Sequence, residues 1–173
     1  MASSPFVRAV GLTVLLAVSP CLAQQAPPSP LDLDAIAFRG IIPGVSTVAD
    51  VKTVLGEPTR TYGRKVLIYE PLSIYVEIVP EANKTEVAAV NLFLVPSPDV
   101  FGAASMLKLK GNPALAAELG AAYSLDAVKS MPGVMSSGPK GWEILHLSRN
   151  GRTASLAYDP ETHELKQVAL YNF

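Results

Sequence analysis

The sequence has little of the chemistry on which most catalytic and metal-binding sites depend. Among its 173 residues are one cysteine and two histidines. The cysteine, Cys21, lies in the N-terminal segment, so no disulfide can stabilise the rest of the chain. Stability must therefore come from buried apolar side chains. About 150 residues can bury roughly two-thirds of the surface of the unfolded chain, which is enough for a core without cross-links.

Recognisable catalytic and cofactor motifs are also missing. The sequence contains no GxSxG, GxxxxGK[ST], GxGxxG or HExxH. His163 lies in the acidic stretch DPETHE (159–164), which we interpret as a solvent-exposed turn, and His146 lies in a predicted strand, where a half-buried structural role is expected. We therefore predict no catalytic residue, no metal site and no cofactor. An enzyme whose acids are scattered over loops is the alternative.

The chain also lacks an excess of positive charge. It has 14 Lys and Arg against 15 Asp and Glu, which gives a formal net charge of −1. Nucleic acids require a basic face for their phosphates, so we expect no nucleic-acid partner. The sequence also predicts no basic amphipathic helix of the kind that binds an anionic membrane surface.

The first 23 residues have the features of a secretory signal peptide. Arg8 is the one charged residue, an apolar run (9–18) follows it, and Ala23 ends the segment with a small side chain. The run is shorter than the roughly 20 residues that span a bilayer, so we expect an exported protein, periplasmic or secreted, with no membrane span after cleavage. An uncleaved anchor is one alternative. Lipid attachment at Cys21 is another, which the proline of the preceding VSP disfavours.

The stretch GIIPGVSTVADVKTVLGEPTR (40–60) predicts one short helix with defined ends. Thr47 is the expected N-cap, and Asp50 three residues later completes a capping box. Apolar residues then recur on one side of about two helical turns. A glycine permits the backbone reversal after the helix, and a proline prevents its continuation. The residues that define this motif are Gly44, Thr47, Asp50, Gly56 and Pro58.

Three segments after this motif predict an antiparallel β-meander. They are RKVLIYE (64–70), LSIYVEIV (72–79) and VAAVNLFLV (87–95), all rich in β-branched and aromatic residues. The polar PEANKTE (80–86) connects the last two as a hairpin. The helix and the meander together form one αβββ unit.

The second half of the chain repeats this pattern. DVKTVLG (50–56) aligns with AVKSMPG (127–133), and VNLFLV (90–95) aligns with VALYNF (168–173). Chance similarity is the alternative. We predict an α+β fold of two tandem αβββ repeats, with short helices packed on antiparallel three-stranded meanders. The expected divisions are a signal peptide (1–23), an extended tether (24–34), a first repeat (35–96), a helical linker (97–120) with helix starts at Pro98 and Pro113, and a second repeat (121–173).

The pattern GxxPGxSTxxDVxxxLGxP, formed here by residues 40–58, resembles the helix start of the SmpA/OmlA family of small outer-membrane assembly lipoproteins. A tandem of such units is similar to the β-lactamase inhibitor protein family, in which two repeats form one concave binding surface. The resemblance implies an αβββ unit and a binding function. This chain departs from both families, since it lacks the repeat disulfides of the inhibitors and has a poor lipoprotein signal before Cys21.

Alternation along the strands predicts which side chains face the helices. The inward set is Val66, Ile68, Ile74, Val76, Ile78, Val90, Leu92 and Leu94, with Leu145, Leu147, Ala154, Leu156, Val168 and Leu170 in the second repeat. The outward set that we expect to bind a partner is Tyr69, Tyr75, Glu77, Phe93, Trp142, His146 and Tyr171. Aromatic side chains on an open sheet face are typical of interface cores. Coverage of this face by the linker or the other repeat is the alternative.

These observations predict a non-catalytic binding module that engages a protein or a cell-envelope component through the open sheet face. A carrier of a small molecule or lipid, with a pocket between sheet and helices, is the alternative function. The two differ in what the core should contain, because a carrier needs an unfilled cavity there.

Overall fold

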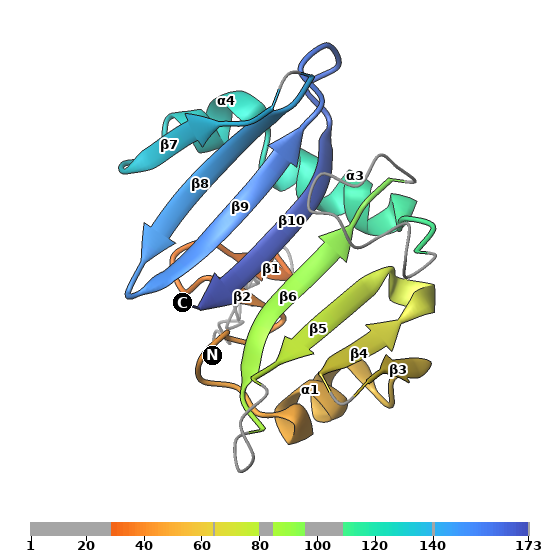
Figure 1. The fold of residues 1–173 in the computed structure, drawn as a ribbon. Helices are drawn as coiled ribbons and strands as arrows, with labels where there is room; N and C mark the ends of the chain where they lie inside the picture. Colours follow the sequence, from red (N-terminus) through yellow and green to blue (C-terminus); the bar gives the residue numbers. More distant parts are fainter. Residues whose placement is uncertain (1–28, 64, 80–84, 96–108, 140, 173) are drawn as a thin grey trace, which may run out of the picture.

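The chain folds around one antiparallel β-sheet, shown in Figure 1. The computed structural model describes residues 29–63, 65–79, 85–95, 109–139 and 141–172. The predictions for the signal peptide, for Cys21 and for a helix start at Pro98 lie outside these residues.

The sheet has eight strands, and every neighbouring pair is antiparallel. Branched and aromatic side chains favour these segments as strands. β6 and β10 pair at the centre of the sheet, which joins the two halves of the chain into one layer. In spatial order the strands are β3 (Arg60–Tyr62), β4 (Val66–Tyr69), β5 (Ile74–Ile78), β6 (Val87–Phe93), β10 (Leu165–Asn172), β9 (Arg152–Tyr158), β8 (Glu143–Arg149) and β7 (Val134–Ser137).

The α+β class and the antiparallel pairing are thus confirmed. The strands predicted as two meanders, β4–β6 and β8–β10, lie side by side in one continuous sheet. Each half contributes a further short strand at a sheet edge, β3 in the first half and β7 in the second. Neither segment has the run of apolar residues by which the other strands are predicted from sequence.

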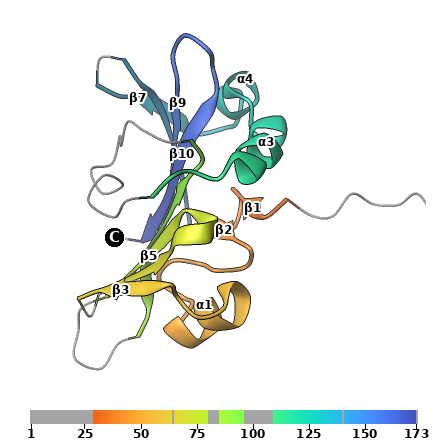
Figure 2. The ribbon, with the colours of Figure 1, turned by 90° about the vertical axis from the view of Figure 1, so that its right-hand side faces the viewer.

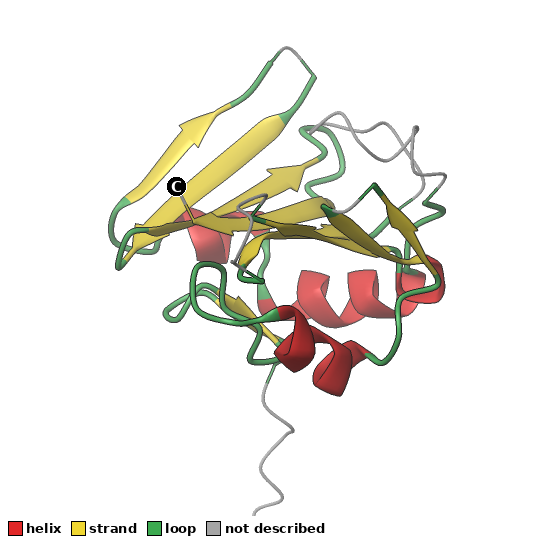
Figure 3. Cartoon of the chain, turned by 60° about the horizontal axis from the view of Figure 1, so that its bottom comes forward, coloured by secondary structure: helices red, strands yellow, loops and turns green. Residues whose placement is uncertain are grey.

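The helices that the structure describes lie on one face of the sheet, as Figures 2 and 3 show. They are α1 (Val48–Leu55), α3 (Pro113–Ala122) and α4 (Leu125–Lys129), with a short 3₁₀ turn, η1 (Glu70–Leu72), between β4 and β5. No helix in the described parts of the chain has both the length and the apolar character needed to cross a bilayer. We call the helix-covered side the inner face and the opposite side the outer face.

The predicted helix ends are confirmed in α1. The Thr47 hydroxyl accepts a hydrogen bond from the Asp50 N–H, and the Asp50 carboxylate accepts one from the Thr47 N–H at 2.8 Å. Gly56 ends the helix with a φ of 82°, a region that side chains disfavour. Ser124 caps α4 by accepting a hydrogen bond from the Ala127 N–H, and Pro113 occupies the first turn of α3, where a helix start is predicted.

The main core lies between the inner face of the sheet and the helices, and it includes residues assigned to the tether. Leu31 and Leu33 are buried in it. They belong to a small hairpin of β1 (Leu31–Asp32) and β2 (Ala37–Phe38). The prediction of an extended tether is therefore wrong for residues 31–34. A tether would leave the two leucine side chains in water, whereas their burial in the core is favourable.

Candidate functional site

The outer face is defined by side chains that pair directly across neighbouring strands, since such pairs point to the same side of a sheet. One continuous line of pairs crosses the sheet from β4 to β7. Its members are Ile68, Tyr75, Asn91, Ala169, Ser155, His146 and Met135. The predicted outward residues Tyr75, Glu77, Phe93, His146 and Tyr171 all belong to this face or its flanks.

In the first half of the sheet the outer face is closed. The rings of Tyr75 and Phe93 stack with their centroids 5.7 Å apart, and each residue is 4% exposed. Together with Ile68 they form a second apolar cluster, against which Val66 and Leu109 pack. The prediction that Tyr75 and Phe93 are accessible for binding is therefore wrong, and the alternative of a covered face holds there.

The assignment of faces along β4 is also wrong. Val66 and Ile68 lie on the outer face, while Tyr69 is buried in the main core with Leu67. The Tyr69 hydroxyl donates to the Gly56 carbonyl at 3.2 Å, and burial, assisted by the charge of Glu57, raises the pKa of Tyr69. Alternation could not assign this strand because its sequence, VLIY, is apolar at every position.

In the second half a row of hydrogen bonds runs across the outer face of four strands. The His146 Nε2 on β8 lies 2.6 Å from the Ser137 hydroxyl on β7. The His146 Nδ1 lies 2.7 Å from the Ser155 hydroxyl on β9. The Ser155 hydroxyl lies 2.9 Å from the Tyr171 hydroxyl on β10. We call Ser137, His146, Ser155 and Tyr171 the polar row.

The polar row is anchored in the sheet and accessible at its ends. Ser155 is 1% exposed, whereas Ser137 is exposed and His146 and Tyr171 are half-buried. Burial lowers the pKa of His146 and so favours the neutral imidazole. A neutral imidazole has one donor and one acceptor nitrogen. It therefore donates a hydrogen bond to one of the two serine hydroxyls and accepts one from the other.

The outer face of the five strands from β6 to β7 carries no Asp, Glu, Lys or Arg at its paired positions. Those positions hold hydroxyl, amide and imidazole groups interspersed with apolar side chains. They are Ala89, Asn91, Phe93, Gln167, Ala169, Tyr171, Thr153, Ser155, Ala157, Ile144, His146, Ser148, Met135 and Ser137. Most of these side chains are buried, and the accessible ones are the exposed Met135, Ser137 and Ser148 with the half-buried His146, Thr153 and Tyr171. The accessible part of this face is therefore electrically neutral and polar.

The structure brings together only part of the predicted binding set. His146 and Tyr171 are linked through Ser155 in the polar row. Trp142 is half-buried directly before β8, and Glu77 lies half-buried on β5. Sequence analysis missed Ser137 and Ser155, each of which stands nine residues from His146. That spacing is a usable signal only once the β7–β8 and β8–β9 hairpins are known.

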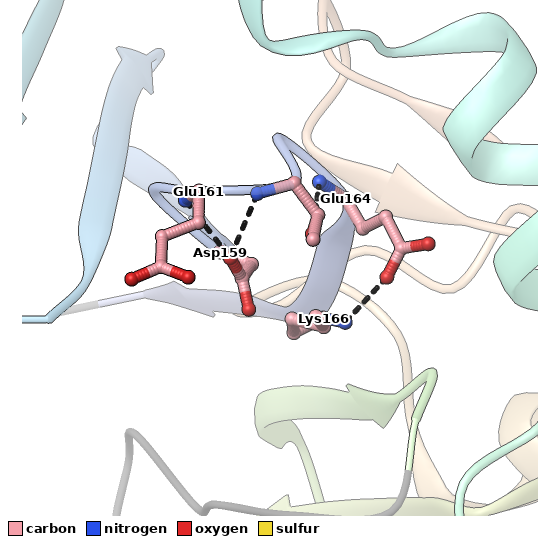
Figure 4. Close-up of polar contacts among 5 residues, drawn as sticks. Asp159, Glu161, Glu164 and Lys166 are labelled. Atoms are coloured by element: carbon pink, nitrogen blue, oxygen red, sulfur yellow. Dashed lines mark hydrogen bonds and ion pairs between the residues drawn. The ribbon is translucent and has the colours of Figure 1, made fainter.

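The turn between β9 and β10, shown in Figure 4, is exposed as predicted. The Asp159 carboxylate accepts hydrogen bonds from the N–H groups of Thr162 and Glu161, both at 2.9 Å, and these bonds lower its pKa. Lys166 pairs with Glu164 at 2.5 Å. No cluster of three or more potential metal ligands occurs among the residues with described positions.

A cavity of about 370 Å³ lies between α3 and this turn. Small side chains of α3 form one wall, and residues of the turn form another. The lining residues are Val95, Ala116, Ala117, Gly120, Tyr123, Ser124, His163, Glu164 and Leu165. The cavity lies beside the main core rather than within it, because Leu115 and Leu119 of the same helix are buried against the sheet.

These features define an α+β protein with helices on one face of a large antiparallel sheet and a neutral, hydrogen-bonded surface on part of the other face. No protein-family model matches the chain, and no curated protein matches it. In fold it is similar to a DUF4309 family protein, YjgB, from Bacillus subtilis, with 12% identity, a TM-score of 0.47 and coverage of 79% of this chain and 84% of that one. It is also similar to a cysteine-rich secretory protein from Staphylococcus aureus, with 10% identity and a TM-score of 0.37, over 73% of this chain and 42% of that one.

Proposed function

We propose that this chain is an exported, non-catalytic binding module that engages a protein or another cell-envelope component through the outer face of β7–β10. The observation that carries the proposal is the polar row, which ends in accessible groups on the sheet face opposite the described helices α1, α3 and α4. Export rests on the signal-peptide features of residues 1–23.

Rigid positioning of the row favours binding. Ser155 is fixed on both sides, by the imidazole of His146 and the hydroxyl of Tyr171. Side chains already held in one arrangement lose little conformational entropy when a ligand covers them. Met135, which is 62% exposed, pairs with His146 and adds an accessible apolar side chain to the same surface.

We further propose that the chain consists of two tandem repeats, each of one helix and four strands. Support comes from the element order, in which α1 precedes β3–β6 and α4 precedes β7–β10. The order of strands in the sheet supports it too, because β6 and β10, the last strand of each half, are central neighbours and β3 and β7, the first of each, are the edges.

The cavity beside α3 favours a small-molecule carrier as a second candidate function. Its volume of about 370 Å³ falls in the range of ordinary ligand pockets. It is open at the surface and mixes alanine and leucine side chains with His163 and Glu164, so it suits a small polar ligand better than a long lipid chain.

Affinity capture with matched tyrosine variants distinguishes these functions. Residues 24–173 are immobilised and exposed to solubilised envelope, in parallel with Tyr171→Ala and Tyr62→Ala. Tyr62 is 56% exposed on β3, at the far edge of the sheet, so its loss controls for the removal of a surface tyrosine. We expect material that wild type and Tyr62→Ala retain and Tyr171→Ala loses. Equal retention by all three would overturn the assignment of this surface.

A further inference from the structure

We propose that the partner of the outer face is an uncharged glycan of the cell envelope, an inference that rests on the binding function proposed above. The binding surface would consist of the polar row together with the neighbouring Met135, Ser148 and Thr153.

The absence of charge on the paired positions from β6 to β7 is the first argument. A ligand that covers a charged side chain must neutralise it, because desolvating an unpaired charge is costly. A neutral ligand can cover a neutral face without desolvating a charge. An ionic ligand would find no side chain of opposite charge there. The charged residues of these strands lie elsewhere, as in Arg149, whose guanidinium donates to the carbonyls of Ser148 and Pro132.

The hydrogen-bonding groups of the surface are the second argument. Hydroxyl groups of serine, threonine and tyrosine both donate and accept, as sugar hydroxyls do. Two such pairs are already in place, Ser148 with Thr153 at 2.9 Å and Ser155 with Tyr171 at 2.9 Å. Serine is depleted in the cores of protein–protein interfaces, so a serine-rich surface favours a glycan over a protein.

Apolar and aromatic groups complete the match. Tyr171 and His146 present rings, and Met135 presents an exposed thioether chain, beside the hydroxyl groups. Pyranose rings have apolar C–H faces that pack against such side chains, and tyrosine combines an apolar ring with a polar tip.

The test uses the exported chain and one charge introduced at two exposed edge positions. Met135→Asp places a carboxylate on the neutral surface, and Tyr62→Asp places the same group on β3 at the opposite sheet edge. Wild type and both variants are immobilised and exposed to three aliquots of solubilised envelope: untreated, digested with proteinase, and oxidised with periodate. Bound carbohydrate and protein are measured separately, and circular dichroism confirms that each variant is folded.

We expect wild type and Tyr62→Asp to retain carbohydrate from the untreated and the digested aliquots and to lose it after periodate oxidation. Met135→Asp should retain less by at least about tenfold, because bound glycan would desolvate its carboxylate. Retention that depends on Met135, survives periodate and disappears after digestion would overturn the glycan and leave the binding surface intact. Retention that does not depend on Met135 would overturn both the glycan and the proposed function.

Discussion

His146 and Ser155 lie opposite each other on β8 and β9, and the imidazole Nδ1 is 2.7 Å from the serine hydroxyl. Ser155 is 1% exposed, so water cannot replace it as the partner of the imidazole. This contact connects the accessible end of the polar row, at Ser137, to Tyr171 on β10. The row therefore links side chains of four neighbouring strands.

Ser155→Ala should lower the free energy of unfolding by about 1–3 kcal/mol, because it removes the shared partner of His146 and Tyr171 from a buried position. Ser137→Ala, at the exposed end of the same row, should change it by less than about 0.5 kcal/mol. Urea unfolding of both variants measures the difference. Equal effects would show that the row does not contribute to stability through Ser155.

Acidification should destabilise the protein through His146. Burial lowers the pKa of His146 in the folded state below its unfolded value of about 6.5, so the unfolded chain binds more protons between the two values. Stability should therefore fall as the pH drops through about 6.5 and continue to fall until the folded pKa is passed. Urea unfolding at about pH 7.5 and about pH 5.5 should show a smaller loss for His146→Asn than for wild type.

The matched control for that experiment is His163→Asn. His163 is exposed in the turn between β9 and β10 and has a φ of 58°, a conformation that asparagine tolerates. We expect this variant to keep the pH dependence of wild type. If His163→Asn, rather than His146→Asn, reduced the pH dependence of stability, the role assigned to His146 would be wrong.

The capping box of α1 makes a separate contribution. Thr47→Ala should cost about 1 kcal/mol, whereas Thr53→Ala, in the middle of the same helix, should be close to neutral. Hydrogen bonds from the backbone and then the side chain of Thr47 lower the pKa of Asp50. The contribution of the Asp50 carboxylate to stability is therefore present above about pH 4 and is lost as the pH falls through the pKa of Asp50 in the folded state.

Carboxyl titration by NMR checks the cap directly. In Thr47→Ala the pKa of Asp50 should rise part of the way to its ordinary value, since the backbone N–H of residue 47 still donates. An unchanged Asp50 pKa would contradict the hydrogen bond from the threonine hydroxyl.

Much of the fold could be predicted because its signals are local. The capping box, the glycine after α1 and the proline at the start of α3 depend on a few neighbouring residues, and all three are confirmed. The strands β5 and β6 lie within the predicted segments because apolar residues dominate them. The short edge strands lack that signal and depend on pairing with β4 and β8.

The candidate site could not be predicted as fully, because it depends on register. Ser137, His146 and Ser155 meet only when β7, β8 and β9 pair in the observed alignment. In the closed first half, Leu109 packs on the cluster that contains Tyr75 from a distant point in the chain. The alternation of apolar and polar residues along one sequence shows neither the register between strands nor the packing of distant segments.

Tyr75→Ala should act on stability rather than on binding. The stacked Tyr75 and Phe93 rings are buried, and loss of a large buried side chain costs about 3–5 kcal/mol. Tyr62→Ala, at an exposed position, should change stability by less than about 0.5 kcal/mol. A Tyr75→Ala protein that unfolds like wild type but no longer binds envelope material would return the first half of the outer face to the binding surface.

Hydroxyl-radical footprinting of residues 24–173, with and without solubilised envelope, tests the proposed binding surface most directly. Met135 and Tyr62 are both more than half exposed, both react with radicals, and they lie on opposite edge strands of the sheet. We predict that bound material protects Met135 and Tyr171 and leaves Tyr62 reactive. Protection of Tyr62 with unchanged oxidation of Met135 and Tyr171 would contradict the assignment of the outer face of β7–β10 as the binding surface.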